Sequence, residues 1–139
     1  MTNREFGRAY IEDARVILAE AEASLEQGHF HRTIRKCQES VEMALKGLLR
    51  VAGIEYPKAH RVGRVLLKSA VTQVVSIERL QDIARVADEL ADAREDAFYG
   101  SESSSAAELF TRDDAADALS KARTVETFVA ELVQRYILP

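Results

Sequence analysis

Charged side chains at two places in the sequence are the best candidates for chemistry. Glu42 and Lys46 lie four residues apart in a segment of helical pattern, in the order that favours an ion pair on one helix face. Such a pair is either a solvated surface contact or a charged wall of a groove. Arg94 continues the apolar series that ends in Leu90 and Ala91, so the spacing predicts a guanidinium on an inward helix face. In that position it must be paired inside the protein or face a partner.

The guanidinium of Arg94 is suited to flat oxyanions such as phosphate, because its donors form a planar fork. The alternative is structural: a long side chain near a helix end reaches water, and its positive charge suits the C-terminal dipole. Both interpretations stay open at the level of the sequence. His60 follows Pro57 and opens the next helical segment. Its imidazole either fixes the turn through a backbone hydrogen bond, which we favour, or contacts a ligand.

Strong motifs for catalysis or cofactor binding are missing from the sequence. It has no phosphate-binding loop, no dinucleotide-binding glycine pattern and no Cys/His set with metal-ligand spacing. His29 and His31 are two residues apart, so on a helix they point to different sides and make a poor metal pair. Cys37 falls on an apolar stripe with no evident cation to stabilise a thiolate, and we predict a core residue. We therefore expect no catalytic residues, no metal and no cofactor.

Length and charge restrict the class of protein. A chain of 139 residues predicts a single domain, 1–139, with its own core. The formal net charge of −4 argues against a protein that simply coats nucleic acid, although a local basic patch is compatible with it. One cysteine excludes an internal disulfide and fits a reducing compartment. No apolar run reaches the roughly 18 residues of a membrane span, and the polar start lacks a signal peptide, so we expect a cytoplasmic protein with no membrane contact.

Capping and stop signals divide the chain into helices. The expected helices are about 3–27, opened by a Thr2–Glu5 capping box; 30–51; a short one at 59–69; 77–99, capped by Ser76; and a last one capped by Thr111. Gly28, Gly53 and Gly100 are expected to end three of them. Residues 71–75 are either a turn or a frayed helix end. The serine-rich stretch 101–105 is expected to be a flexible loop.

Apolar residues recur at helical spacing on each long segment and predict the buried faces. The predicted inward residues are Phe6, Tyr10, Ala14, Ile17, Leu18, Ala21 and Leu25; Phe30, Ile34, Cys37, Val41, Ala44, Leu45 and Leu48; Leu80, Ile83, Ala84, Ala87, Leu90, Ala91, Arg94 and Phe98; and Ala115, Leu119, Ala122, Val125, Val129, Leu132, Val133 and Tyr136. The fold class is therefore predicted to be all-α, an antiparallel up-and-down bundle of four long helices plus one short helix.

Three segments resemble the HEPN domain, a helical family named for nucleotide binding in higher eukaryotes and prokaryotes. The first is the Gln38-Glu39 pair that leads into Glu42-Met-Ala-Leu-Lys-Gly-Leu-Leu49. The second is the glycine-containing turn followed by His60. The third is Arg94-Glu-Asp-Ala-Phe-Tyr-Gly100 with the loop and helix start that follow it, which resembles small prokaryotic members.

This resemblance implies a bundle that forms homodimers, and in many members a partnership with a minimal nucleotidyltransferase. Other members are ribonuclease toxins, in which an Arg and a His four to six residues later form a composite site across the dimer. Arg94 matches that Arg, but Tyr99 lies where the pattern permits the His, and no His follows His60. A tyrosine hydroxyl titrates near pH 10 and does not replace imidazole as a proton shuttle at neutral pH.

We therefore expect a non-catalytic module that binds a nucleotide or a nucleic-acid phosphate, or that partners a nucleotidyltransferase in a system of toxin–antitoxin type. The candidate ligand-binding residues are Arg94 for a phosphate, Lys46 for added charge, Glu42 in the same wall, and His60 and Tyr99 for orientation or stacking, with Arg35 and Lys36 as weaker candidates. One alternative is a ribonuclease toxin in which Arg94 has a non-standard partner. Another is a structural homodimer without a ligand.

Overall fold

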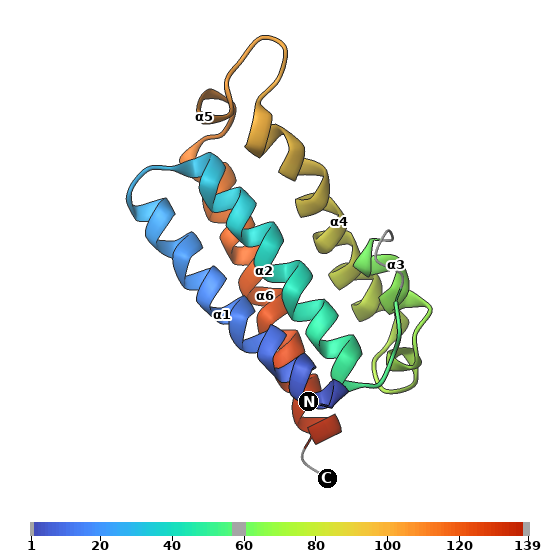
Figure 1. The fold of residues 1–139 in the computed structure, drawn as a ribbon. Helices are drawn as coiled ribbons and strands as arrows, with labels where there is room; N and C mark the ends of the chain where they lie inside the picture. The colour runs from blue at the N-terminus through green and yellow to red at the C-terminus, as the bar shows by residue number, and fades with distance from the viewer. Residues whose placement is uncertain (1, 57–60, 138–139) are drawn as a thin grey trace.

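The protein is a bundle of antiparallel helices in the computed structural model, which describes residues 2–56 and 61–137 (Figure 1). Its elements are α1 (Asn3–Glu26), α2 (Phe30–Val51), α3 (Val62–Leu67), a 3-10 turn η1 (Ala70–Gln73), α4 (Ile77–Tyr99), α5 (Ala106–Leu109) and α6 (Arg112–Ile137). No strand occurs in these two ranges. The predicted all-α fold is confirmed, with α1, α2, α4 and α6 as the four long helices.

The predicted caps are present at the three helix starts. Thr2 Oγ1 accepts from the Glu5 amide at 3.2 Å, and the Glu5 carboxylate accepts from the Thr2 amide at 2.7 Å. At the start of α4, Ser76 Oγ accepts from the Arg79 amide at 3.3 Å. Thr111 and Asp114 form a reciprocal pair of the same kind, at 3.2 and 2.9 Å. These contacts satisfy amide groups that have no partner inside a helix, so the sequence signals fix where these helices begin.

Helix α2 lies at the centre of the bundle, packed against α1, α4 and α6 (Figure 1). Its residues Leu45, Leu48 and Leu49 are completely buried. Phe128 of α6 is a further fully buried core residue that the sequence analysis missed, because it falls beside the stripe that contains Val125. The opposite face of α2 stays polar and carries the candidate site.

Two glycines bring the backbones of α1 and α2 into contact. A Cβ atom at Gly7 would lie 2.6 Å from the Gly47 carbonyl oxygen, and one at Gly47 would lie 2.7 Å from that of Gly7. Such distances exclude any side chain at either position without a shift of a helix. Farther along the same seam, the Ser40 hydroxyl donates to the Ala14 carbonyl at 2.8 Å. The α1–α2 pair is therefore closer than larger residues would permit.

This close approach corrects the predicted inward face of α1. Phe6 is 41% exposed and Tyr10 is only partly buried, whereas Gly7 and Ile11 lie inside. The buried stripe is offset by one residue because the glycine, rather than the aromatic ring, faces α2. Beyond Ile11 the prediction holds for Ala14, Ile17, Leu18 and Ala21, which are buried. Leu25 is only partly buried against the core.

The segment between α2 and α4 differs from the prediction. The short helix was expected over 59–69, but among the described residues it covers Val62–Leu67; His60 lies outside the described residues. Ser69 caps the turn η1 instead, accepting from the Val71 amide at 3.3 Å. Val71 and Val75 are buried, so this stretch is an ordered turn over the core. Helix α3 packs on α4, where a Cβ at Gly63 would lie 3.0 Å from the Ala84 carbonyl oxygen.

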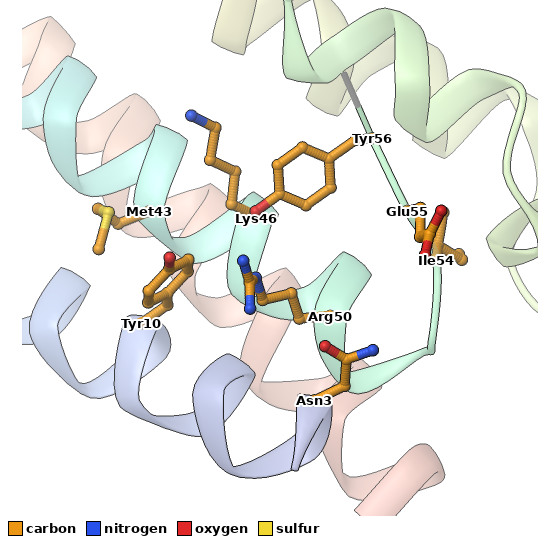
Figure 2. Close-up of a pocket in the computed structure, with 8 residues that line it drawn as sticks. All are labelled: Asn3, Tyr10, Met43, Lys46, Arg50, Ile54, Glu55 and Tyr56. Atoms are coloured by element: carbon orange, nitrogen blue, oxygen red, sulfur yellow. The ribbon is translucent and has the colours of Figure 1, made fainter. Parts of the chain in front are cut away.

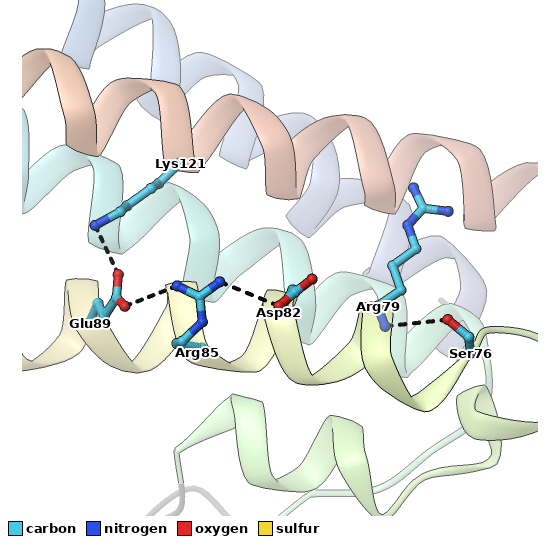
Figure 3. Close-up of polar contacts among 6 residues, drawn as sticks. All are labelled: Ser76, Arg79, Asp82, Arg85, Glu89 and Lys121. Carbon is cyan, nitrogen blue, oxygen red and sulfur yellow. Dashed lines mark hydrogen bonds and ion pairs between the residues drawn. The ribbon is translucent and has the colours of Figure 1, made fainter.

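Charged side chains connect the surfaces of α4 and α6 (Figure 3). Lys121 contacts Glu89 at 2.8 Å, and Arg85 contacts the same carboxylate at 3.2 Å. These contacts, led by the hydrogen bond from Lys121, lower the pKa of Glu89. Because the groups are exposed, each pair contributes little to stability. Among the described helices, none is both long enough and apolar enough to cross a membrane.

Candidate functional site

A stripe of charged residues follows the outer face of α2. It consists of Arg35, Glu39, Glu42, Lys46 and Arg50. Spacings of three and four residues place these side chains on one side of the helix, because an α-helix has 3.6 residues per turn. The other side of α2 is buried in the bundle, so a ligand of this helix would meet the stripe and the residues beside it.

The structure brings three predicted residues together in the middle of the stripe. The Glu42 carboxylate lies 3.1 Å from Lys46 Nζ and 3.9 Å from the Arg94 guanidinium. Gln38 donates to the same carboxylate at 3.4 Å, while its own carbonyl oxygen is buried without a partner among the described residues. Glu42 is thus neutralised from two helices, and its cations retain donors that can turn outward.

The predicted position of Arg94 on the buried face is wrong. Its side chain is 45% exposed, and the inward positions near the end of α4 are taken by Ala93 and Ala97. After Leu90, helical spacing permits either 93 and 97 or 94 and 98 to continue the buried stripe. The small alanines pack against the bundle, so Arg94 and Phe98 turn toward the outer face of α2.

Because the side chains of Arg94 and Phe98 lie toward the outer face of α2, a basic pocket forms between α2 and α4. We call it the arginine pocket. It encloses about 340 Å³ and is lined by Arg32, Arg35, Lys36, Glu39, Arg94 and Phe98. The guanidinium carbon of Arg35 lies 3.6 Å from the centre of the Phe98 ring, and that of Arg94 lies 5.2 Å from it. One ring therefore holds two guanidinium groups, an arrangement that cation–π attraction stabilises.

The charge balance of the arginine pocket is strongly positive, with four cations against the single carboxylate of Glu39. Lys36 also has an ion pair, at 3.5 Å, with Glu20. The pKa of nearby His31 is lowered, first by burial and then by the charges of Arg32 and Arg35. A basic pocket on a chain with net charge −4 is a local feature that selects anions.

Cys37 lies in this part of α2 and is the nucleophile candidate of the sequence. Cys37 is buried, and burial raises the pKa of its thiol to about 12, so the thiolate is absent at neutral pH. No group of three His, Cys, Asp or Glu side chains in the described ranges is arranged to hold a metal ion.

The family comparison and the comparison with solved structures point to the same family. The chain matches the HEPN domain family over residues 8–132. It belongs to the HEPN family. Its fold is similar to the crystal structure of TT1696 from Thermus thermophilus, with a TM-score of 0.74, 29% identity and coverage of 91% of this chain and 97% of the other.

A second similar structure, ST0689, is described as an archaeal HEPN homologue. It has a TM-score of 0.71 and 24% identity, and the alignment covers 91% of this chain and 97% of that one. The comparison with curated proteins gives no match.

In this HEPN domain the predicted residue Tyr99 does not line the arginine pocket. Tyr99 is 81% exposed, and its ring centre lies 5.8 Å from that of Phe98, outside the residues that line the pocket. His60 lies outside the described residues. Arg32 and Phe98 were missed as site residues; the i, i+3 spacing of Arg32 and Arg35 was the available signal.

Proposed function

We propose that this HEPN domain is a non-catalytic module that binds the phosphate groups of a nucleotide or of nucleic acid in the arginine pocket. The observation that carries the proposal is the pair of guanidinium groups of Arg35 and Arg94 on opposite helices, held by the same Phe98 ring. Guanidinium groups bind phosphate through two parallel hydrogen bonds, and Arg32 and Lys36 add further positive charge.

The exposure of Arg94 supports a binding role over a structural one. Its ion pair with Glu42 is long, at 3.9 Å, and Glu42 has a closer cation in Lys46. Arg94 can therefore turn to an incoming phosphate without leaving an unpaired carboxylate behind.

Fluorescence anisotropy with labelled single-stranded RNA, and with ATP as competitor, tests the proposal. We expect the double variant Arg35→Ala with Arg94→Ala to bind at least about tenfold more weakly, because two charge-assisted contacts are lost. A tenfold change corresponds to about 1.4 kcal/mol of binding free energy. The matched control is Arg15→Ala with Arg123→Ala, which removes the same charge from exposed positions elsewhere. Equal loss in both double variants, or no binding by the wild type, would overturn the proposal.

The same protein preparation tests the absence of catalysis. We expect the RNA to stay intact, because no imidazole follows Arg94 in the chain and an exposed tyrosine does not shuttle protons at neutral pH. Gel analysis after long incubation measures this directly. Cleavage by the wild type that disappears in Arg94→Ala would overturn the proposal and show that the protein is a ribonuclease.

A further inference from the structure

A second pocket opens on the same face of α2, toward its C-terminal end (Figure 2). We call it the tyrosine pocket. It encloses about 470 Å³ and is lined by Asn3, Tyr10, Met43, Lys46, Arg50, Ile54, Glu55 and Tyr56. This volume is within the range of small-molecule sites in proteins. Residues from α1, α2 and the segment after α2 meet there, so the pocket exists only in the folded bundle.

Two cations in this pocket lie against aromatic rings. The Arg50 guanidinium carbon is 5.1 Å from the centre of the Tyr10 ring and 5.3 Å from that of Phe6. Lys46 Nζ is 5.9 Å from the centre of the Tyr56 ring. In Figure 2 the Tyr10 and Tyr56 side chains approach Arg50 and Lys46 from different sides of the pocket. The rings thus hold the cations at the pocket, with the charges available to an anion.

The charge and the polar groups of the tyrosine pocket suit a nucleotide unit. The lining holds Lys46 and Arg50 against the carboxylate of Glu55. Because Lys46 is also paired with Glu42 at 3.1 Å, Arg50 is the cation that an anion would meet first. The Arg50 guanidinium is charged at any physiological pH, and contact with the Tyr56 hydroxyl raises its pKa further. Asn3 offers both a donor and an acceptor to a base or a sugar. Aromatic faces next to cations are the usual combination of single-strand binding surfaces.

The tyrosine pocket and the arginine pocket lie along the same face of α2. Arg35 and Arg50 lie on the same α2 stripe, and a rise of 1.5 Å per residue separates them by roughly 22 Å along the helix. Stacked nucleotides advance about 3.4 Å each, so roughly six or seven of them cover this distance. Between the pockets, the Glu42 carboxylate is already paired with Lys46 and Arg94. The Glu39 carboxylate also lies on this path, at the edge of the arginine pocket.

We propose that the tyrosine pocket is a second nucleotide subsite and that one single strand of nucleic acid bridges it and the arginine pocket along α2. The bridging rests on the proposed function, whereas the pocket itself is a separate site. A base stacks on Tyr10 or Tyr56, and the adjoining phosphate contacts Lys46 or Arg50. A strand too short to reach both pockets has one set of contacts and binds more weakly.

Binding of oligouridylates of three and eight nucleotides, measured by anisotropy at one fixed salt concentration, tests the bridge. We expect the wild type to bind the octamer at least about tenfold more tightly than the trimer, as a second linked contact raises the overall affinity. In Arg50→Ala with Tyr56→Leu, this advantage should disappear. The matched control is Arg79→Ala with Val16→Leu, exposed positions outside both pockets, and it should keep the advantage.

Two outcomes separate the two proposals. An octamer advantage that survives in the Arg50/Tyr56 variant overturns the tyrosine pocket alone, provided that a thermal melt shows the variant to be folded. The single variant Arg50→Ala serves as the second readout if the double variant is unfolded, and it should reduce the advantage. An octamer affinity that is insensitive to Arg35→Ala with Arg94→Ala overturns the arginine pocket and, with it, the bridge.

Discussion

Glu126 of α6 is the least satisfied ionisable residue in the described core. One of its carboxylate oxygens is buried without a hydrogen-bond partner, and the other lies 3.8 Å from Arg15 Nε. Burial raises the pKa of Glu126 by more than the nearby charge of Arg15 lowers it, and Glu22 and Glu12 add smaller increases. A carboxyl group whose folded pKa exceeds its unfolded value favours the folded state below that unfolded value. The benefit is lost as the pH rises through the folded pKa.

Replacing Glu126 with glutamine is therefore expected to stabilise the protein at pH 7. The gain is about 1 kcal/mol, because a partly buried charge with one unsatisfied oxygen is removed, while only a weak ion pair with Arg15 is lost. Below about pH 4 both variants carry a neutral group, and the difference should vanish. Thermal melts at pH 7 and pH 4 measure both effects. A lower midpoint for the variant at pH 7 would show that the Arg15 contact outweighs the cost of burial.

Arg94→Leu is expected to change the free energy of unfolding by no more than about 0.5 kcal/mol, the usual range for an exposed position. The guanidinium is nearly half exposed, and Glu42 keeps its closer contact with Lys46 when Arg94 is removed. A denaturant titration of both proteins measures the difference. A loss of about 3 kcal/mol or more would identify Arg94 as a structural residue with a paired, buried charge.

These residues also show what could be predicted at this scale. The spacing of Glu42 and Lys46 correctly predicted their ion pair, because i, i+4 neighbours meet on any helix. The burial of Arg94 was predicted wrongly, since two stripes separated by one residue fit the helical period equally well. The choice between them depends on which side chains the neighbouring helices accept, and a single helix does not contain that information.

At the scale of elements, the glycine contact between α1 and α2 leads to the sharpest prediction. Gly47→Ala improves the intrinsic helix propensity by about 1 kcal/mol, but its Cβ would lie 2.7 Å from the Gly7 carbonyl oxygen. Because backbone atoms cannot move aside as a side chain does, we expect a net destabilisation of about 1–3 kcal/mol.

The measurement is the unfolding midpoint in urea, with Glu39→Ala on the exposed face of α2 as the control for helix propensity. We expect the control to stay within about 0.5 kcal/mol of the wild type. An unchanged or more stable Gly47→Ala protein would mean that the two helices separate easily, and that the close approach is dispensable.

The presence of the long helices was easier to predict than the face that each one buries. Side-chain caps such as Thr2 and Ser76 act within one turn, so they can be recognised from neighbouring residues. The offset of the α1 stripe was unpredictable from α1 alone, because it depends on Gly47 lying opposite Gly7. Helix α5 was also missed, since a single turn at Ala106–Leu109 has too few residues for a periodic pattern.

At the scale of the whole molecule, we predict a homodimer. Family membership motivates this expectation, and several large apolar side chains are exposed among the described residues. These are Phe6, Val16, Val74, Ile77, Phe98 and Tyr99. Light scattering at micromolar concentration should give twice the mass of one chain. A monomer that persists on tenfold concentration would contradict the prediction.

The backbone contact between Gly7 and Gly47 has a consequence for the entropy of ligand binding. Tyr10 lies one turn after Gly7, and Lys46 and Arg50 flank Gly47, so the contact fixes the distance between the two walls of the tyrosine pocket. Folding has already ordered these walls, and a ligand that enters between them restricts only the side chains that it touches. For the ligand proposed above, this preorganisation favours binding, and a substitution at either glycine is expected to weaken the affinity without altering any residue that contacts the ligand.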